Sequence, residues 1–331
     1  MKKYLFLLLG LAGAITFTAC GGDDEPTEQA VNFSINPNTV ITPLLPAEVV
    51  SGDLETLSST EVLEVHHYLY DENGNKVFEQ QNDVKNYTTI VKESTYLEAG
   101  SYTSVVITVV CSKTSNIHFW ELSGFDRLST ATITRSKYLG LQAGILGLDV
   151  RTVTINETGN NDLKIEPEPF GAMFSTIYLN IHTYDVISTL GLAANRTADS
   201  LSFDSYGDPQ VSIQSNNNAF AWWNSYFDPN DRSADNVYYY QFIVPMSNYK
   251  VRFEAYSSSN EQLLATDSYS YTVNKGDCFL HYIDLCDEEN DNKITYGGGK
   301  ICGKASMPSF DAEAVNAEEC SIRIAELPIA K

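Results

Sequence analysis

The sequence has little positive charge. Its 331 residues include 21 Lys and Arg against 43 Asp and Glu, which gives a formal net charge of −22. A surface this acidic repels the phosphates of nucleic acids and the headgroups of anionic lipids. We therefore expect no nucleic-acid partner, and attachment to a membrane must depend on something other than the protein surface.

Signatures of catalysis are also missing. The chain contains no Gly-x-Ser-x-Gly elbow, no phosphate-binding loop and no dinucleotide fingerprint. Its five histidines lack the helical i, i+4 spacing or the cysteine pairing of a zinc site. The adjacent His66 and His67 are expected to point to opposite faces of one strand. The sequence thus predicts neither an enzyme nor a bound metal or cofactor.

The apolar run at the start of the chain, Tyr4 to Phe17, is shorter than the roughly 20 residues of a membrane-spanning helix. It follows Lys2 and Lys3 and stops at Thr18-Ala19-Cys20, which is the pattern of a lipoprotein export signal. We predict that residues 1–19 are removed and that Cys20, carrying covalent lipid, anchors the mature chain. An ordinary secretory signal peptide is the alternative.

An acidic cluster, Asp23, Asp24 and Glu25, follows this cysteine. It resembles the surface-export signal of lipoproteins from Bacteroidota, and that resemblance implies exposure on the outer face of the outer membrane. The alternative is a solvated acidic tether. Residues 20–52 are predicted to form a tether or extended arm, in which Val31 to Ile35 is long enough for an edge strand and too short for a helix.

Five cysteines remain apart from the lipidated one, so at least one is unpaired or pairs between chains. Cys278 and Cys286 fall on one predicted strand about 26 Å apart, beyond the reach of a disulfide. A disulfide from Cys286 to Cys302 or Cys320 would instead attach the C-terminal tail to the preceding domain. Cys111 lies in a strongly apolar strand and is expected to be a buried thiol.

The rest of the chain reads as short strands separated by turns. From Val62 to Tyr70, apolar and polar residues alternate, which predicts a half-buried strand. The turn residues Asp71 to Asn75 contain the Asn-Gly pair of a tight hairpin, and Lys76 to Gln81 is the expected partner strand. The continuous β-branched run Val105 to Cys111 predicts a strand that is buried on both faces.

The same order of strand, turn and partner strand recurs in the second half, after a break near residues 158–169 rich in Gly, Asn and Pro. Many short strands without amphipathic helices indicate an all-β fold of sandwich type. We therefore predict two tandem domains, residues 53–160 and 170–290, followed by a C-terminal tail of residues 291–331.

Three loose motifs carry a family resemblance: Leu69 to Asn75, Leu97 to Tyr102 and Gly276 to Leu285. The chain resembles the minor fimbrial anchor and assembly subunits of Bacteroidales, within the fimbrillin superfamily. This resemblance implies two tandem transthyretin-like or Ig-like β-sandwiches on a lipid anchor. It further implies a non-catalytic role at the base of a fimbria, with other fimbrial subunits bound by strand complementation. The tail after Asn290 departs from the family.

A second functional hypothesis is glycan binding at the cell surface. Aromatic residues gather in and beside an Asn- and Asp-rich stretch of the second domain, among them Trp222, Trp223, Tyr226 and Tyr238. Aromatic rings stack on the apolar faces of sugars, and neighbouring amides and carboxylates bind the hydroxyl groups. Adjacent tryptophans in a strand point to opposite faces, so at least one of the two is expected in the core.

Overall fold

The computed structural model describes residues 27–44, 57, 59–113, 117–135, 144–179, 187–194, 200–204, 207–212, 221–226, 237–257, 263–288 and 291–302. In this part of the chain, 21 strands form five sheets, and the α-helix is a single turn. The all-β fold class is therefore confirmed. No helix among the described residues has the length and hydropathy to span a membrane.

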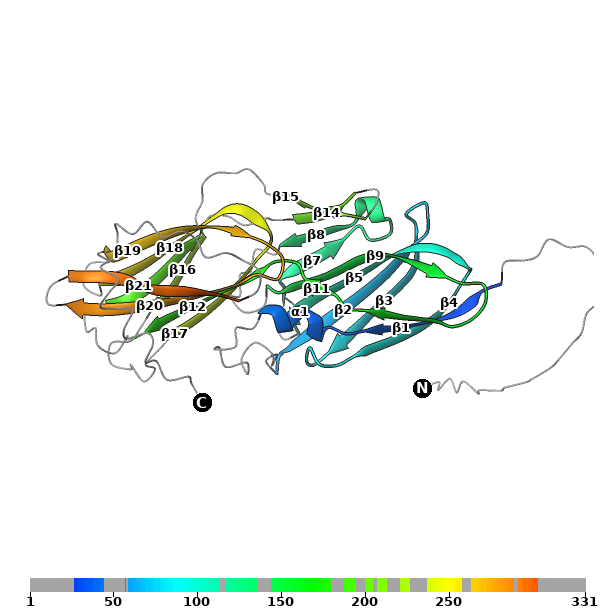
Figure 1. Ribbon diagram of the computed structural model, residues 1–331, viewed down its shortest axis with the longest axis horizontal. Coiled ribbons are helices and arrows are strands. Elements are labelled where there is room, and N and C mark those ends of the chain that lie inside the picture. Colours follow the sequence, from blue (N-terminus) through cyan, green and yellow to red (C-terminus); the bar gives the residue numbers. More distant parts are fainter. Residues whose placement is uncertain are drawn as a thin grey trace, which may run out of the picture.

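A six-stranded sheet forms the centre of one end of the molecule (Figure 1). Its main path runs in the order β11-β9-β5-β2-β3, and β6 pairs with β5 outside this path. Its strands are β2 (Glu61–Tyr70), β3 (Lys76–Val84), β5 (Gly100–Ser112), β6 (Ile117–His118), β9 (Leu146–Ile155) and β11 (Glu168–Pro169).

Two smaller sheets pack on the central sheet from opposite sides. The first has the order β10-β1-β4, with β1 (Gln29–Ile35), β4 (Val91–Leu97) and β10 (Asn161–Ile165). The second has the order β15-β14-β8-β7, with β7 (Trp120–Ser123), β8 (Thr132–Arg135), β14 (Ser200–Phe203) and β15 (Pro209–Ser212). Ring contacts join the layers: Phe33 lies against Phe78 on one side, and Tyr68 stacks on Phe125 on the other.

This arrangement corrects the expectation that Val62 to Tyr70 forms a half-buried strand. Both faces of β2 are covered, so Glu64, Tyr68 and Tyr70 are buried on the face predicted to be solvated. The tyrosines suit this position because their rings pack while a hydroxyl can still find a partner. The Tyr70 hydroxyl donates to the Phe125 carbonyl over 3.0 Å. The expectation for β5 is confirmed, because Val105 to Cys111 is buried throughout.

The predicted hairpin is also confirmed. Gly74 has a φ of +72°, the left-handed conformation that glycine adopts without strain. The Asp71 carboxylate accepts hydrogen bonds from the backbone N–H groups of Asn73 and Asn75 at 2.9 and 2.8 Å. These two bonds fix the turn between β2 and β3.

The N-terminal segment differs from the expected tether. The strand predicted at Val31 to Ile35 is a central strand, since β1 pairs with a neighbour on each side. A short helix α1 (Asn38–Ile41) and a 3₁₀ turn (Thr42–Leu44) follow it, where no helix was expected. Val40, Ile41 and Leu44 are fully buried. Their burial among residues distant in sequence supplies the stability that so short a helix lacks by itself.

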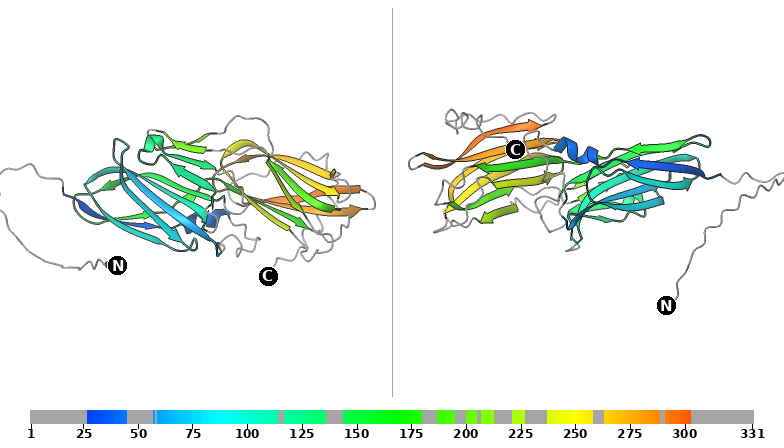
Figure 2. Two further views of the ribbon diagram at one scale, coloured as in Figure 1. Left: turned by 180° about the vertical axis from the view of Figure 1, so that it is seen from behind. Right: turned by 90° about the horizontal axis from the view of Figure 1, so that it is seen from below.

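Two four-stranded sheets form the other end of the molecule (Figures 1 and 2). The sheet β17-β12-β20-β21 contains β12 (Ala172–Leu179), β17 (Val237–Ile243), β20 (Cys278–Glu288) and β21 (Asp291–Cys302). The sheet β16-β13-β18-β19 contains β13 (Ile187–Ala194), β16 (Ala221–Tyr226), β18 (Met246–Ser257) and β19 (Leu263–Val273).

One segment crosses between the two ends. Strands β14 and β15 come from residues 200–212, within the range predicted for the second domain, yet β14 pairs with β8 at the first end. Leu201 and Phe203 join the buried cluster there. The limits 53–160 and 170–290 stay a prediction, and the structure adds that β14 and β15 lie at the first end.

Candidate functional site: the N-terminal strand and the sheet edges

Strand β1 completes a sheet whose other two strands do not touch. It pairs in parallel with β10 and antiparallel with β4, so Phe33 lies between Leu163 and Glu93. Among the described strands, β10 and β4 are joined to each other only through β1. We call the space between β10 and β4 the β1 slot. It is a place where one added strand satisfies two sheet edges at once.

The floor of the β1 slot is apolar and aromatic. Val31, Phe33 and Ile35 point inward, with exposed fractions of 0, 2 and 0 %. The ring of Phe33 meets the imidazole of His67 edge-on, with ring centres 4.6 Å apart, and lies 5.9 Å from the ring of Phe78. The alternation of buried and exposed residues in β1 therefore follows directly from its place over the central sheet.

A buried polar network lies beside Phe33 and ties the two sheets together. The Glu93 carboxylate of β4 reaches across the interface to the Nδ1 atom of His67, 2.7 Å away. The Asn82 amide donates to the same carboxylate over 2.7 Å, and the Nε2 atom of His67 is 3.1 Å from the Ser104 hydroxyl. Each of these buried groups is hydrogen-bonded, as the interior of a protein requires.

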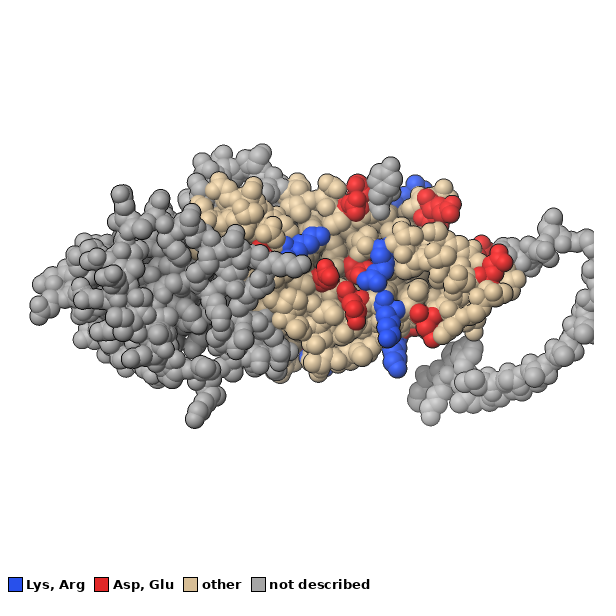
Figure 3. All heavy atoms as spheres, in the orientation of Figure 1, with Lys and Arg blue, Asp and Glu red and all other residues tan. Residues whose placement is uncertain are grey.

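The outer face of this sheet is polar. Asn32 of β1 donates to the Asp162 carboxylate over 2.8 Å, and this bond, followed by one from Asn160, lowers the pKa of Asp162. Ser34 lies in register between Lys92 and Lys164. Acidic and basic side chains are mixed over this end of the molecule (Figure 3). The outer face of this sheet is therefore solvated.

The segment after β1 reaches the other end of the molecule. The Cys278 thiol at the start of β20 donates to the Leu44 carbonyl over 3.5 Å. In β9, Gly147 leaves room for Val40, because a Cβ atom placed there would lie 2.5 Å from a Val40 methyl group. Residues 29–44 are therefore fixed between both groups of sheets.

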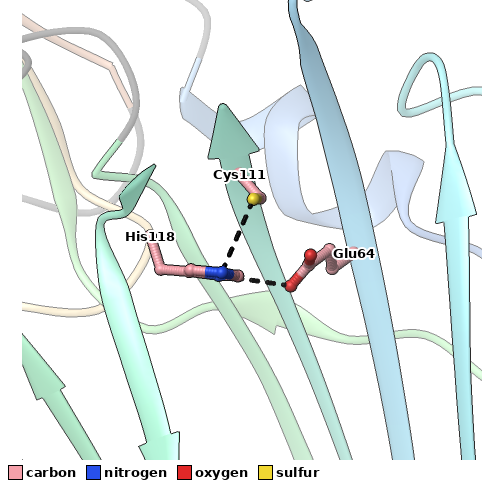
Figure 4. Close-up of side chains that lie close together, drawn as sticks. All are labelled: Glu64, Cys111 and His118. Atoms are coloured by element: carbon pink, nitrogen blue, oxygen red, sulfur yellow. Dashed lines mark hydrogen bonds and ion pairs between the residues drawn. The ribbon is translucent and has the colours of Figure 1, made fainter. Parts of the chain in front are cut away.

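A second polar cluster lies on the opposite face of the central sheet from the β1 slot. It contains Glu64, Cys111 and His118 (Figure 4), and His66, which contacts Glu64. Register brings it together: Cys111 of β5 lies opposite His118 of β6 and opposite Val62 of β2, two residues from Glu64. His66 and His67 point to opposite faces, as predicted.

Distances within this cluster are short. The Glu64 carboxylate is 3.1 Å from the Nε2 atom of His66 and 3.6 Å from the Nδ1 atom of His118. The Cys111 sulfur is 3.8 Å from the Nε2 atom of His118. The side chain of Glu64 is 8 % exposed and that of His118 is 37 % exposed, so the cluster is buried with one imidazole at the surface.

The charges of the cluster act on one another. Burial acts to raise the pKa of Glu64, but the hydrogen bond and charge of His66, together with His118, outweigh it and hold the pKa below its ordinary value. Burial, followed by the nearby Glu64 charge, raises the pKa of the Cys111 thiol to about 11. The expectation of a buried Cys111 thiol is confirmed.

Sequence reasoning did not find this cluster. Its three most closely grouped members are widely spaced in sequence, and His118 belongs to a two-residue strand that no periodicity reveals. The one readable signal was Glu64 and His66 on the same face of a single strand.

The lipid and surface-export residues of the sequence analysis, and the last cysteine, lie outside the described residues; they are Cys20, Asp23, Asp24, Glu25 and Cys320. The glycan-binding candidates are on edge strands. Trp222, Trp223 and Tyr226 belong to β16, and Tyr238 belongs to β17, which is in a different sheet.

The structure does not place Cys286 opposite Cys302, one of its two predicted disulfide partners. In the hairpin of β20 and β21, Cys302 lies opposite Cys278, while Cys286 lies opposite Lys293. The register therefore separates Cys286 from Cys302 by most of the length of the hairpin. The other proposed partner of Cys286, Cys320, follows β21 in the chain.

No protein-family model and no curated protein sequence matches the chain. Its fold does match solved structures. It is similar to a candidate polysaccharide-binding protein from Bacteroides thetaiotaomicron, with a TM-score of 0.51 and 11 % identity over 83 % of this chain and 95 % of that one. This likeness shows the fold.

Two further similar structures are from the same order of bacteria. The fimbrial anchor protein Mfa2 from Porphyromonas gingivalis gives a TM-score of 0.43 and 10 % identity over 84 % of this chain and 98 % of that one. A candidate adhesin from Bacteroides ovatus gives a TM-score of 0.47 and 10 % identity, covering 82 % and 92 %. Fimbrial and adhesin structures of Bacteroidales are thus among those to which the chain is similar.

Proposed function

We propose that this protein is a cell-surface lipoprotein, held in the outer membrane by lipid on Cys20, that anchors or assembles a fimbria by binding a β-strand of another subunit. It acts by binding and not by catalysis. The observation that carries the proposal is the β1 slot: among the described strands, β10 and β4 pair with β1 and not with each other. The fold itself is therefore completed by adding one strand, β1, between two others.

The size of β1 shows that one strand can hold a chain segment in place. Its three inward side chains, Val31, Phe33 and Ile35, are buried almost completely. Burial of each such side chain contributes about 1.5–3 kcal/mol, and backbone hydrogen bonds form along both edges. A partner strand of similar length and alternation could bind a free sheet edge in the same way.

The β1 slot is filled by the chain itself, close to the proposed anchor. Cys20 and Gln29 are nine residues apart, a distance of at most about 32 Å when extended. Because the lipid anchor would hold β1 close to the membrane, we expect β1 to remain bound in the β1 slot. We therefore assign the partner strand to edges at the other end, where β16 and β17 each pair with one strand among those described.

The opposite edges of those two sheets are less suitable. There β19 and β21 pack against each other, which covers that side of the sandwich. Strands β16 and β17 carry the aromatic segment and are separated in sequence by ten residues. We select β17 for the test. It is an edge strand of the sheet that also holds β12 and β20, the strands nearest the start and the end of the predicted second domain.

Proline substitution tests strand addition at β17. Successive residues of an edge strand direct their N–H groups alternately toward the neighbouring strand and toward solvent. Tyr239→Pro and Tyr240→Pro therefore differ: one breaks a bond to β12, and the other removes only an outward donor. The variant that keeps its hydrogen bond to β12 should fold and reach the membrane, and fimbrial subunits should no longer co-purify with it.

Alanine at the same two positions is the matched control, because it shortens the side chain and keeps the N–H group. Co-purification should survive in the alanine variants. If both proline variants retain the fimbrial subunits at the wild-type level, the partner strand does not bind β17. If no fimbrial subunit co-purifies with the wild-type lipoprotein, the fimbrial function itself is wrong.

Glycan binding is the second candidate function. It is favoured by the aromatic residues Trp222, Trp223, Tyr226 and Tyr238 on two edge strands, and by the polysaccharide-binding description of the Bacteroides thetaiotaomicron structure. On a polysaccharide affinity gel, the wild-type chain should then migrate more slowly than Trp222→Ala. Equal migration of the two proteins on every polysaccharide tested would reject this function.

A further inference from the structure

We propose that Glu64, Cys111 and His118 bind one zinc ion. The donor atoms of these three side chains all lie within 4.8 Å of one another, and the three residues come from three strands of the central sheet. The inference is independent of the fimbrial function and concerns the opposite face of the sheet from the β1 slot. Water would occupy the fourth ligand position, on the side where His118 is exposed.

The chemistry of the donors selects the metal. A thiolate, an imidazole and a carboxylate are the ordinary ligands of zinc, whereas calcium and magnesium take oxygen ligands. Zinc bond lengths of about 2.0–2.3 Å place tetrahedral donors roughly 3.3–3.7 Å apart. The Cys111 sulfur and the Nε2 atom of His118 are 3.8 Å apart, and all three donor atoms lie within 4.8 Å of one another. The Glu64 carboxylate faces the other ring nitrogen, Nδ1, at 3.6 Å, so the carboxylate has to shift toward Nε2 to complete the geometry.

The charge balance suits a buried site. Zinc displaces the proton of the Cys111 thiol, which passes to solvent as the sulfur–zinc bond forms. The thiolate and the Glu64 carboxylate then bring two negative charges to a dication, and a neutral His118 adds none. A site without net charge avoids the free-energy penalty of burying an unpaired ion.

His66 has a positioning role in this site. Its Nε2 atom is 3.1 Å from the same Glu64 oxygen that faces His118. A hydrogen bond from an outer residue to a metal-binding carboxylate orients that carboxylate, and its loss typically weakens metal binding 10- to 100-fold. The cluster therefore has ligands and a supporting contact, both of which a metal site requires.

Zinc binding can be measured directly on the full-length protein. The purified chain is stripped with a chelator and dialysed against zinc, and bound metal is determined by elemental analysis. We expect one zinc per chain. Cys111→Ser and His118→Ala should each weaken binding by at least about 100-fold, since loss of a ligand exceeds loss of an outer contact. Cobalt in place of zinc should give a thiolate charge-transfer band, which Cys111→Ser abolishes.

Two controls separate the site from nonspecific effects. Cys278→Ser removes a second buried cysteine and should leave zinc binding unchanged. His66→Ala should weaken binding 10- to 100-fold, and His66→Gln, which keeps an N–H donor, should restore part of it.

The most informative variant is His118→Ala, because the His118 side chain is 37 % exposed and its loss leaves the core intact. A folded His118→Ala protein that binds zinc as tightly as the wild type overturns the proposal. So does a folded wild-type protein that binds no zinc. Loss of the zinc in His118→Ala, with the zinc retained in Cys278→Ser, supports it.

Discussion

Removal of the Phe33 side chain should release β1 without unfolding the rest of the protein. Phe33 is 2 % exposed and contacts the rings of His67 and Phe78 at the floor of the β1 slot. Replacing a buried phenylalanine by alanine costs about 3–5 kcal/mol. Because each 1.4 kcal/mol is a factor of ten, the equilibrium for opening of β1 should rise about 100- to 4000-fold in Phe33→Ala.

Native-state hydrogen exchange measures this opening strand by strand. Amides of β1, and those of β4 and β10 that bond to it, should exchange faster in Phe33→Ala by the same two to three and a half orders of magnitude. Amides in the middle of β2 and β5 should change much less. Asn32→Ala is the control: it removes one exposed hydrogen bond, which contributes about 1 kcal/mol, or roughly fivefold.

Two results would refute this reasoning. If β2 and β5 exchange faster by the same factor as β1, the strand does not open separately, and the β1 slot is simply part of one cooperative core. If β1 exchanges less than tenfold faster, Phe33 does not hold the strand in place. Either result would remove the main structural support for strand addition in this fold.

Three other predictions follow from single residues. Cys20→Ala should release the protein from the membrane fraction, as measured by fractionation and immunoblotting, and full retention in the outer membrane would reject the lipid anchor. Gly147→Ala should lower the free energy of unfolding by about 1–3 kcal/mol because the new methyl group collides with the Thr108 hydroxyl and with Val40, whereas the methyl group of Gly100→Ala in the adjacent strand meets only the Tyr102 side chain at ordinary contact distance; urea titration compares the two. Glu93→Ala leaves the buried His67 and the half-buried Asn82 without a hydrogen-bond partner and should cost roughly 2–6 kcal/mol in the same assay.

Local patterns in the sequence predict individual strands well. The turn from Asp71 to Asn75 and the buried run from Val105 to Cys111 are found as predicted, because a turn depends on its own residues and a continuous β-branched run is apolar on both faces. The position of a strand within a sheet is harder to predict from the sequence. Gln29 to Ile35 has the composition of an edge strand, and only its distant partners β4 and β10 make it central.

Layering was the second feature that local reasoning could not supply. The alternation in Val62 to Tyr70 is the same whether one or both faces are covered, since tyrosine, histidine and glutamate tolerate burial when they are hydrogen-bonded. Residues 200–212 provide part of the cover, from far along the chain. The Glu64, Cys111 and His118 cluster escaped prediction for the same reason, because its members meet only through the register of three strands.

The layering also bears on how a partner can bind. The central sheet has β1, β4 and β10 on one side and the sheet of β7, β8, β14 and β15 on the other, so both of its faces contribute side chains to the core. The outer face of the β1 sheet is polar, and its lysines and carboxylates are solvated.

Large exposed apolar side chains in the part of the chain for which burial is described are few and separate: Val77, Ile90, Tyr96 and Val211. That part of the protein therefore presents no continuous apolar surface of the kind at which proteins dock. The unpaired backbone groups of an edge strand are what the proposed strand addition would use.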